Sequence, residues 1–248
     1  MSPNRAVLPE AGRAPAGWSR FIALALFVSM VLLTPFLLLL DGGRAGKLLE
    51  MFNLHARTED SGIGAEEYPA LAEALSGYLS GWRTDAQLMI IDGGEAAPAF
   101  KPHEVLHLKD VRSLFRLSET LALCAIVPTA LSAGAVFRIR RYGRGKGLVA
   151  LGKGGQAAAL AAGGLLSIIA LGTVMDFSAA FTLLHRLAFA NDLWLLDPME
   201  DLLLQLMPEP FFTEYAFRAA LRILAALAVL FAAFTGLKYF GKRLAVEG

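Results

Sequence analysis

Four long apolar runs restrict what this sequence can fold into. They cover roughly residues 21–40, 117–137, 157–184 and 218–240, and a helix needs about 20 residues to cross the hydrocarbon core of a bilayer. A helix satisfies its own backbone hydrogen bonds, so it suits a chain that crosses lipid. The sequence therefore predicts an all-α, polytopic membrane protein with four transmembrane helices, in which residues 1–248 form a single integral membrane domain.

The first run is either a retained anchor or the apolar part of a cleaved signal peptide. It is longer than the apolar region of a signal peptide, and no small-x-small cleavage site stands before the polar segment DGGRAGK that follows it. We therefore expect it to stay in the membrane.

Basic residues are distributed unevenly, and this predicts the orientation of the chain. The loop RIRRYGRGKGLVALGKGG after the second run has no acid, and both terminal segments are basic, whereas residues 185–217 hold six acids. Because cytoplasmic loops are enriched in lysine and arginine, we expect both termini in the cytoplasm and residues 41–116 and 185–217 on the outer side. The basic residues are Arg5, Arg13, Arg20, Arg138, Arg140, Arg141, Arg144, Lys146, Lys153, Lys238, Lys242 and Arg243.

Residues 41–116 form the one sizeable segment outside the membrane. The stretch EEYPALAEALSGYLSGW has apolar residues at helical spacing, AQLMII is short and β-prone, and DGGEAAP is typical of a turn or loop. A helix is expected to begin near Lys101 and Pro102 and to continue into the second run. Proline suits the first turn of a helix, and Glu104 suits its positive N-terminal dipole.

Two features are interpreted as architecture. The single cysteine, Cys124, lies inside the second run, where an apolar helix favours core packing over a reactive thiolate. Gly155, Ala159 and Gly163 recur every four residues in the third run and form a face for close helix packing. No nucleic-acid-binding motif is visible, so no nucleic acid partner is expected.

Two histidines are the strongest candidates for chemistry. On a helix, Glu104 and Asp110 lie three residues from His107, where a carboxylate can orient an imidazole and raise its basicity. His185 is predicted at the end of the third run, in LLHRLAFANDLWLLDP, which has more polar groups than a membrane anchor needs. All four histidines of the chain fall in the predicted outer segments: His55, His103, His107 and His185.

Three charged residues near the predicted outer boundary each have two interpretations. Asp176 is costly inside an apolar run, so it is either a site residue or a cap or ion-pair partner of a nearby arginine. Arg218 and Arg222 lie one turn apart at the start of the fourth run. They either snorkel with ion pairs to Asp197 or Asp201, which we favour, or contact an ester or phosphate carried by a lipid.

A metal site is the rival interpretation of the histidines. His103 and His107 are four residues apart, and together with Asp110 and His185 they would suffice for zinc or copper in a metal-binding or transport protein. Many helices carry such a pair by chance, and we expect no metal or other cofactor. The sequence has no G-x-S-x-G motif, so histidine acid–base chemistry is favoured over a serine nucleophile.

The stretch LLHRLAFANDLWLLDPMEDLLLQLMPEPFF, together with HEVLHLKDVRSLF and DFSAAF, resembles the lipoprotein intramolecular transacylase family of bacterial membrane proteins. The likeness includes the four-span layout, the GYLSGW segment and both histidine blocks, so it covers most of the chain. This sequence has Leu184 and Ala188 where the family often has aromatic residues. These differences concern the fit of an acyl groove more than the chemistry.

The resemblance implies an enzyme that acts at the extracytoplasmic face of the bacterial plasma membrane on a diacylated lipoprotein, with membrane lipid as its surroundings. The sn-2 acyl chain of the diacylglyceryl-cysteine would move to the free α-amine of the same cysteine and give a lyso-form lipoprotein. Donor and acceptor are in one molecule, so no covalent enzyme intermediate is required and orientation supplies about 7 kcal/mol or more.

The implied reaction has two proton transfers, because the α-ammonium, with a pKa near 8, must lose a proton and the glyceryl oxygen must gain one. We assign His107 and His185 to these transfers, with either one as the base. Asp110 and Asp197 would orient them, and Asn191 would donate to the oxyanion. The remaining candidates are Glu104 and Asp176 in support, and Trp194, Arg218 and Arg222 for substrate binding, although Trp194 suits the membrane interface better.

Overall fold

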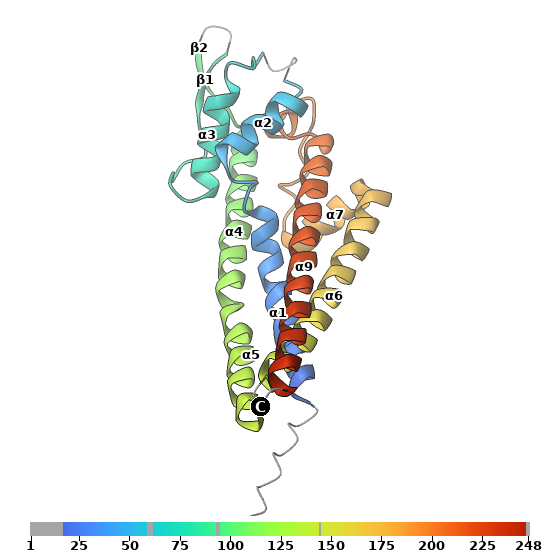
Figure 1. Cartoon of the computed structure of the whole chain (residues 1–248). Helices are drawn as coiled ribbons and strands as arrows, with labels where there is room; N and C mark the ends of the chain where they lie inside the picture. Colours follow the sequence, from blue (N-terminus) through green and yellow to red (C-terminus); the bar gives the residue numbers. More distant parts are fainter. Residues whose placement is uncertain (1–16, 59–61, 93–94, 144, 247–248) are drawn as a thin grey trace, which may run out of the picture. The chain divides into compact units, whose positions relative to one another are not determined.

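The computed structural model describes residues 17–58, 62–92, 95–143 and 145–246 (Figure 1). Within these residues the elements are α1 (Trp18–Leu39), α2 (Ala45–His55), α3 (Tyr68–Leu79), β1 (Met89–Asp92), β2 (Glu95–Pro98), α4 (Pro102–Cys124), α5 (Ile126–Ile139), η2 (Arg140–Tyr142), α6 (Lys146–Met175), α7 (Phe177–Ala188), α8 (Leu202–Leu206) and α9 (Glu209–Val246).

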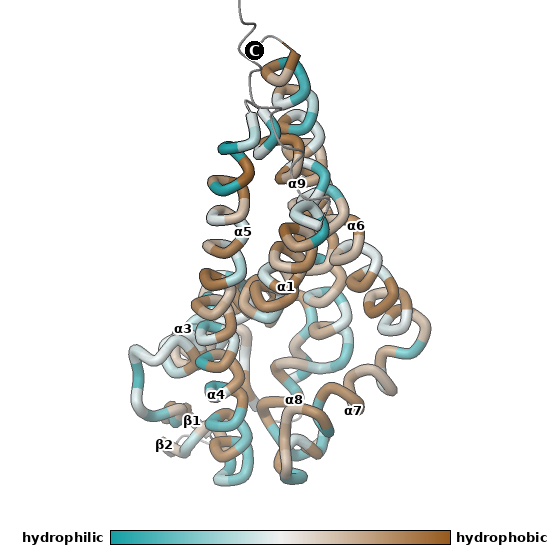
Figure 2. Tube along the Cα trace, turned by 90° about the horizontal axis from the view of Figure 1, so that it is seen from below, coloured by the Kyte–Doolittle hydropathy of each residue, from teal (hydrophilic) through white to brown (hydrophobic). Residues whose placement is uncertain are grey.

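Four helical stretches of the described chain are long and apolar enough to cross a membrane: α1, α4 through η2, α6 and α9. Hydrophobic colour runs along much of α1, α5 and α6 in Figure 2. The prediction of an all-α, polytopic protein with four transmembrane helices is therefore confirmed.

The chain forms two compact units. Unit 1 contains Met1–Val31, Cys124–Leu165 and Leu224–Gly248, and unit 2 contains Leu32–Leu123 and Leu166–Ile223. The segments predicted to be cytoplasmic belong to unit 1, and the two segments predicted to be outside belong to unit 2. Three of the basic residues behind that prediction, Arg5, Arg13 and Arg144, lie outside the described residues.

Unit 1 is a bundle of closely approaching helices. A Cβ atom at Gly155 of α6 would lie 2.3 Å from the ring of Phe234 in α9, and Ala159 is buried, so the small residues allow close packing as the sequence predicts. Ile22 of α1 packs with residues of α5 and α6. Cys124 is exposed, so the prediction of core packing was wrong. Its side chain lies on the surface of the protein.

Unit 2 has an apolar core built mainly from elements outside the four long runs. Met51 of α2, Leu71 of α3 and Leu206 of α8 are each completely inaccessible and belong to one cluster, to which β1 and the starts of α4 and α9 also contribute. The predicted helix in EEYPALAEALSGYLSGW is confirmed as α3.

The segment after β1 differs from its prediction. Glu95–Pro98 pairs antiparallel with Met89–Asp92, so the prediction of a loop was wrong for β2, while the two glycines between the strands lie outside the described residues. Alanine has weak β propensity, but pairing with a neighbouring strand overrides it.

The predicted start of α4 is confirmed. Pro102 occupies the first position of the helix, and the Glu104 carboxylate accepts hydrogen bonds from the backbone N–H of Lys101 and of Leu203, each at 2.7 Å. The first bond is half of a capping box, and the second fixes α8 to α4. Glu104 is completely buried, and its two hydrogen bonds stabilise the start of α4, the helix that carries His107.

The third long helix ends earlier in the sequence than predicted. α6 ends at Met175, and Asp176 adopts extended backbone angles (φ −151°, ψ 90°) while its side chain accepts a 2.9 Å hydrogen bond from the N–H of Ala179. An aspartate in this position satisfies a free N–H at a helix start. The prediction of one helix through residue 184 was therefore wrong: Asp176 begins α7, the helix that carries His185.

Candidate active site

α7 holds His185 in a row of aromatic rings. Phe177, Phe181 and His185 are four residues apart, which places them on one helix face, and Phe189 follows at the same spacing. Ring centroids are 5.7 Å apart for Phe177 and Phe181, 4.0 Å for Phe181 and His185, and 5.5 Å for His185 and Phe189. The imidazole is thereby held between two phenyl rings.

A hydrogen bond fixes the tautomer of His185. Its Nδ1 lies 2.8 Å from the carbonyl oxygen of Phe181, and because a carbonyl oxygen only accepts, Nδ1 carries the hydrogen. In the neutral imidazole the lone pair is then on Nε2. Burial lowers the pKa of His185 from its usual 6.5, and the hydrogen bond to Phe181 only partly opposes this. The ring is therefore neutral at pH 7 with Nε2 able to accept a proton.

His107 of α4 lies next to His185. The two ring centroids are 6.1 Å apart and the ring planes are tilted by 30°, while the ring of Phe189 meets His107 edge-on at 5.3 Å. His107 is buried, and its Nδ1 makes no hydrogen bond within the described residues. A buried polar atom without a partner requires an explanation, and a role in binding or catalysis is one.

Trp194 completes the aromatic surroundings. Its ring lies 5.1 Å from that of His185, and Phe212 lies 5.3 Å from Phe181. Sequence reasoning did not single out the phenylalanines. The four-residue spacing of Phe177, Phe181, His185 and Phe189 is the signal that would have found them.

Asp110 and Asn191 bond to each other. The Asn191 amide Nδ2 donates to the Asp110 carboxylate at 2.8 Å, and its Oδ1 accepts from the N–H of Leu193 at 3.1 Å. The sequence assigned Asp110 to orient a histidine and Asn191 to donate to an oxyanion. The observed bond instead joins the loop after α7 to α4, the helix of His107.

The segment after Trp194 is fixed by Asp201. This buried carboxylate accepts from the N–H of Asp197 at 2.8 Å and contacts His103 Nε2 at 3.0 Å and Lys101 Nζ at 3.1 Å. Burial raises the pKa of Asp201, but these three donors outweigh it and the net pKa is lowered. The side chain of Asp197 accepts from the N–H of Met199, so Asp197 shapes a turn instead of orienting a histidine.

The residues of the rival metal site do not converge. His103 is engaged by Asp201, and within the described ranges no group of three or more histidine, cysteine, aspartate or glutamate side chains is arranged to hold a metal ion. Of the four proposed ligands, His107 and His185 form a pair, whereas His103 contacts Asp201 and Asp110 contacts Asn191.

Arg218 and Arg222 form ion pairs, although not with the predicted aspartates. Arg218 contacts Glu50 at 2.5 Å and also pairs with Glu214, and Arg222 pairs with Asp41. The acids of the α1–α2 region reach the start of α9 within unit 2, a contact between distant segments that the sequence did not reveal. Ion pairing was predicted correctly, and the partners Asp197 and Asp201 were wrong.

Comparisons with known proteins agree with this architecture. A family model described as lipoprotein intramolecular transacylase Lit matches residues 21–212. The solved structure of the membrane-integral lipoprotein intramolecular transacylase Lit from Bacillus cereus is 19% identical, with a TM-score of 0.65, over 92% of this chain and 100% of that chain.

Two variants of the same Bacillus cereus protein give similar results. One has a histidine replaced by arginine, with 19% identity and a TM-score of 0.65 over 91% of this chain and 94% of that one. The other has alanine in place of the histidine, with 20% identity and a TM-score of 0.62 over 91% and 96%. No curated protein matches the sequence.

The solved structures establish the shared fold, and the family model covers most of the sequence, including both histidines and the loop between α7 and α8. This chain belongs to the lipoprotein intramolecular transacylase (Lit) family of membrane acyltransferases.

Proposed function

We propose that this protein moves the sn-2 acyl chain of a diacylglyceryl-cysteine, at the N-terminus of a bacterial lipoprotein, to the α-amine of the same cysteine. The amine nitrogen attacks the ester carbonyl carbon, an amide bond forms, the ester C–O bond breaks, and one proton passes from nitrogen to the glyceryl oxygen. The observation that carries this proposal is the pair of imidazoles of His107 and His185, 6.1 Å apart.

His185 is proposed as the base. Its neutral form, with a lone pair on Nε2, accepts the proton of the attacking amine and returns it to the departing oxygen, so the ring ends the cycle unchanged. His107 is proposed to donate a hydrogen bond to the carbonyl oxygen as negative charge develops there. The bond from His185 Nδ1 to the Phe181 carbonyl supports this division of roles, because it commits the only N–H of neutral His185.

The aromatic rings are proposed to favour transfer over hydrolysis. Phe181, Phe189 and Trp194 pack around His185, and an enclosure of this kind excludes bulk water from a reacting ester. The acyl chains of the substrate are themselves apolar, so the same rings suit them as contacts. Substrate is proposed to enter from the lipid phase.

The site is proposed to lie at the extracytoplasmic face of the bacterial plasma membrane, with both termini in the cytoplasm and the 248 residues acting as one integral membrane domain. Support comes from the charge distribution, because the loop of residues 138–155 is basic and has no acid, whereas residues 185–217 hold six acids.

The direct test uses a purified diacylated lipoprotein with a free N-terminal cysteine amine. The transfer is an isomerisation, so the intact mass should stay the same while the α-amine stops reacting with an amine reagent and one acyl chain becomes resistant to mild alkali. Addition of a third acyl chain, or a reporter that keeps its free amine, would contradict the proposal. A mixture of deuterated and ordinary reporters should give no exchange of chains between molecules.

The pH dependence of single-turnover rates should report the neutral form of His185. With an amine pKa near 8, log rate should rise by about one per pH unit between pH 6.5 and 7.5, because only the amine is titrating there. The pKa of His185 is lowered below 6.5, so a steeper slope of about two should appear only at more acidic pH. A slope of two already above pH 6.5 would contradict a lowered pKa.

A further inference from the structure

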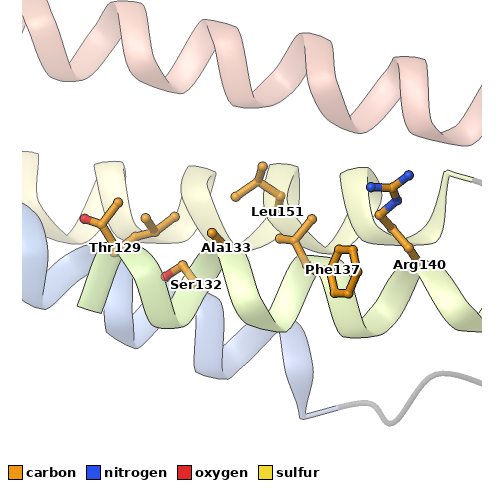
Figure 3. Close-up of a pocket in the computed structure, with 8 residues that line it drawn as sticks. Thr129, Ser132, Ala133, Phe137, Arg140 and Leu151 are labelled. Atoms are coloured by element: carbon orange, nitrogen blue, oxygen red, sulfur yellow. The ribbon is translucent and has the colours of Figure 1, made fainter. Parts of the chain in front are cut away.

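A second candidate site lies in unit 1 and shares no residue with the histidine pair, which belongs to unit 2. It is a groove of about 380 Å³ lined by α1, α5 with η2, and α6. Most of its lining is apolar, with Leu26, Phe137 and Leu151 among the residues. Figure 3 shows Thr129 at one end of the labelled row and Arg140 at the other, with Phe137 between them.

The wall of the groove is part of a packed core. Leu26, Val136 and Leu151 pack against the buried cluster that contains Ile139. A Cβ atom at Gly147 of α6 would lie 2.9 Å from the carbonyl oxygen of Val136 and 3.2 Å from Arg140, so glycine lets α6 approach α5 closely at the arginine end. The groove is therefore a built feature of the helix packing.

The groove has the length of one leaflet. At a rise of about 1.5 Å per residue, Thr129 and Arg140 are separated along the helix by roughly 16 Å, about half of the ~30 Å hydrocarbon core. The Thr129 hydroxyl already donates to the carbonyl oxygen of Ala125 at 2.9 Å, so that end presents no free donor. An acyl chain fits a wall of this length and polarity, with a charged group only at the Arg140 end.

The charge around the groove has one sign. In the described residues of unit 1 there is no aspartate or glutamate, whereas there are nine lysines and arginines. The Arg140 guanidinium lies 5.9 Å from the ring centroid of Phe137 and has no carboxylate partner in the described chain. Phosphate is the complementary group, because arginine binds it through charge-assisted hydrogen bonds. The nine residues are Arg20, Arg138, Arg140, Arg141, Lys146, Lys153, Lys238, Lys242 and Arg243.

We propose that this groove binds one anionic glycerophospholipid, with an acyl chain along α5 and its phosphodiester on Arg140. The lipid bridges α1, α5 and α6 and supplies the negative charge that this part of the chain lacks. The proposal does not depend on the reaction assigned to the histidines. Binding and catalysis can therefore fail separately in experiments.

The headgroup contact is tested by native mass spectrometry of the purified full-length protein in detergent, titrated with phosphatidylglycerol or phosphatidylethanolamine. Wild type should retain one phosphatidylglycerol in preference to phosphatidylethanolamine. Arg140→Gln should weaken phosphatidylglycerol binding about five-fold, corresponding to ~1 kcal/mol per basic residue near the headgroups. The matched control Arg141→Gln removes the same charge from η2 outside the groove lining and should keep the preference.

The acyl contact is tested by filling the groove. Ala133 and Ala130 are both exposed on the same helix, and only Ala133 lines the groove. Ala133→Trp should abolish retention of the lipid and Ala130→Trp should not, with thermal unfolding confirming that both variants fold. Equal binding of the two lipids by wild type, equal effects of the two arginine variants, or displacement of the lipid by millimolar inorganic phosphate would each overturn the proposal, the last by indicating a free-anion site.

Discussion

Replacing His185 by glutamine is expected to slow acyl transfer by about 10²- to 10⁴-fold, the usual effect of removing a general acid–base group. A glutamine side chain is polar and close in size to the imidazole, but it cannot take up a proton. Substrate binding should therefore persist while the chemical step is lost. The measurement is the single-turnover rate at which the reporter loses its reactive α-amine.

Two histidine-to-glutamine substitutions outside the histidine pair serve as matched controls. His55→Gln alters a histidine in α2 that contacts Glu214 at 2.5 Å, and His103→Gln alters the histidine held by Asp201. Both should keep a rate near that of wild type. Loss of activity in His103→Gln together with stoichiometric zinc or copper would support the metal-binding alternative. A folded His185→Gln protein with more than a tenth of the wild-type rate would remove His185 from the mechanism.

Replacing His107 by phenylalanine is expected to reduce the rate by about 10²- to 10³-fold, the cost of losing one donor to an oxyanion. His107→Phe keeps an aromatic ring beside Phe189, which now contacts His107 edge-on at 5.3 Å, and so preserves most of the packing. His107→Gln, whose amide N–H can still donate a hydrogen bond, should lose less than His107→Phe, whereas equal losses in the two variants would contradict a hydrogen-bond donor role for His107. The measurement is the same single-turnover assay, accompanied by thermal unfolding.

The pH profile separates His107 from His185. Because His107 is proposed to donate a hydrogen bond and not to accept the proton, His107→Gln should keep the change of slope below pH 6.5, whereas His185→Gln should lose it. A profile that changes shape in the His107 variant and stays intact in the His185 variant would exchange the two roles.

The membrane-spanning helices could be predicted from the sequence because hydropathy and length are enough to identify them. The end of α6 could not, since an isolated Asp176 in an apolar run has the same sequence signal whether it lies inside a helix or begins a new one. The extended backbone at Asp176 and the bond from the Ala179 N–H to its carboxylate distinguish the two in the structure. The pairing of β2 escaped prediction for a related reason, because the partner strand supplies what alanine lacks in propensity.

The histidine pair could be predicted, whereas the contacts that support it could not. His107 and His185 stand out because ionisable residues close to long apolar runs, in numbers beyond what anchoring needs, call for a reason. The bonds of Asn191 to Asp110 and of His103 to Asp201 join distant segments, and nothing in either local sequence names the partner. The phenylalanines around His185 could have been predicted, because they lie at four-residue spacing in and directly after α7.

The central claim is that two imidazoles act as one unit on a single acyl transfer. It is tested most directly by the single-turnover rates of wild type, His185→Gln, His107→Phe and the double variant, measured on one diacylated reporter. Residues that act together have non-additive effects, so the double variant should be no more than about ten-fold slower than the slower single variant. Losses that multiply across the two sites, or a double variant that still blocks the amine at the wild-type rate, would contradict the account.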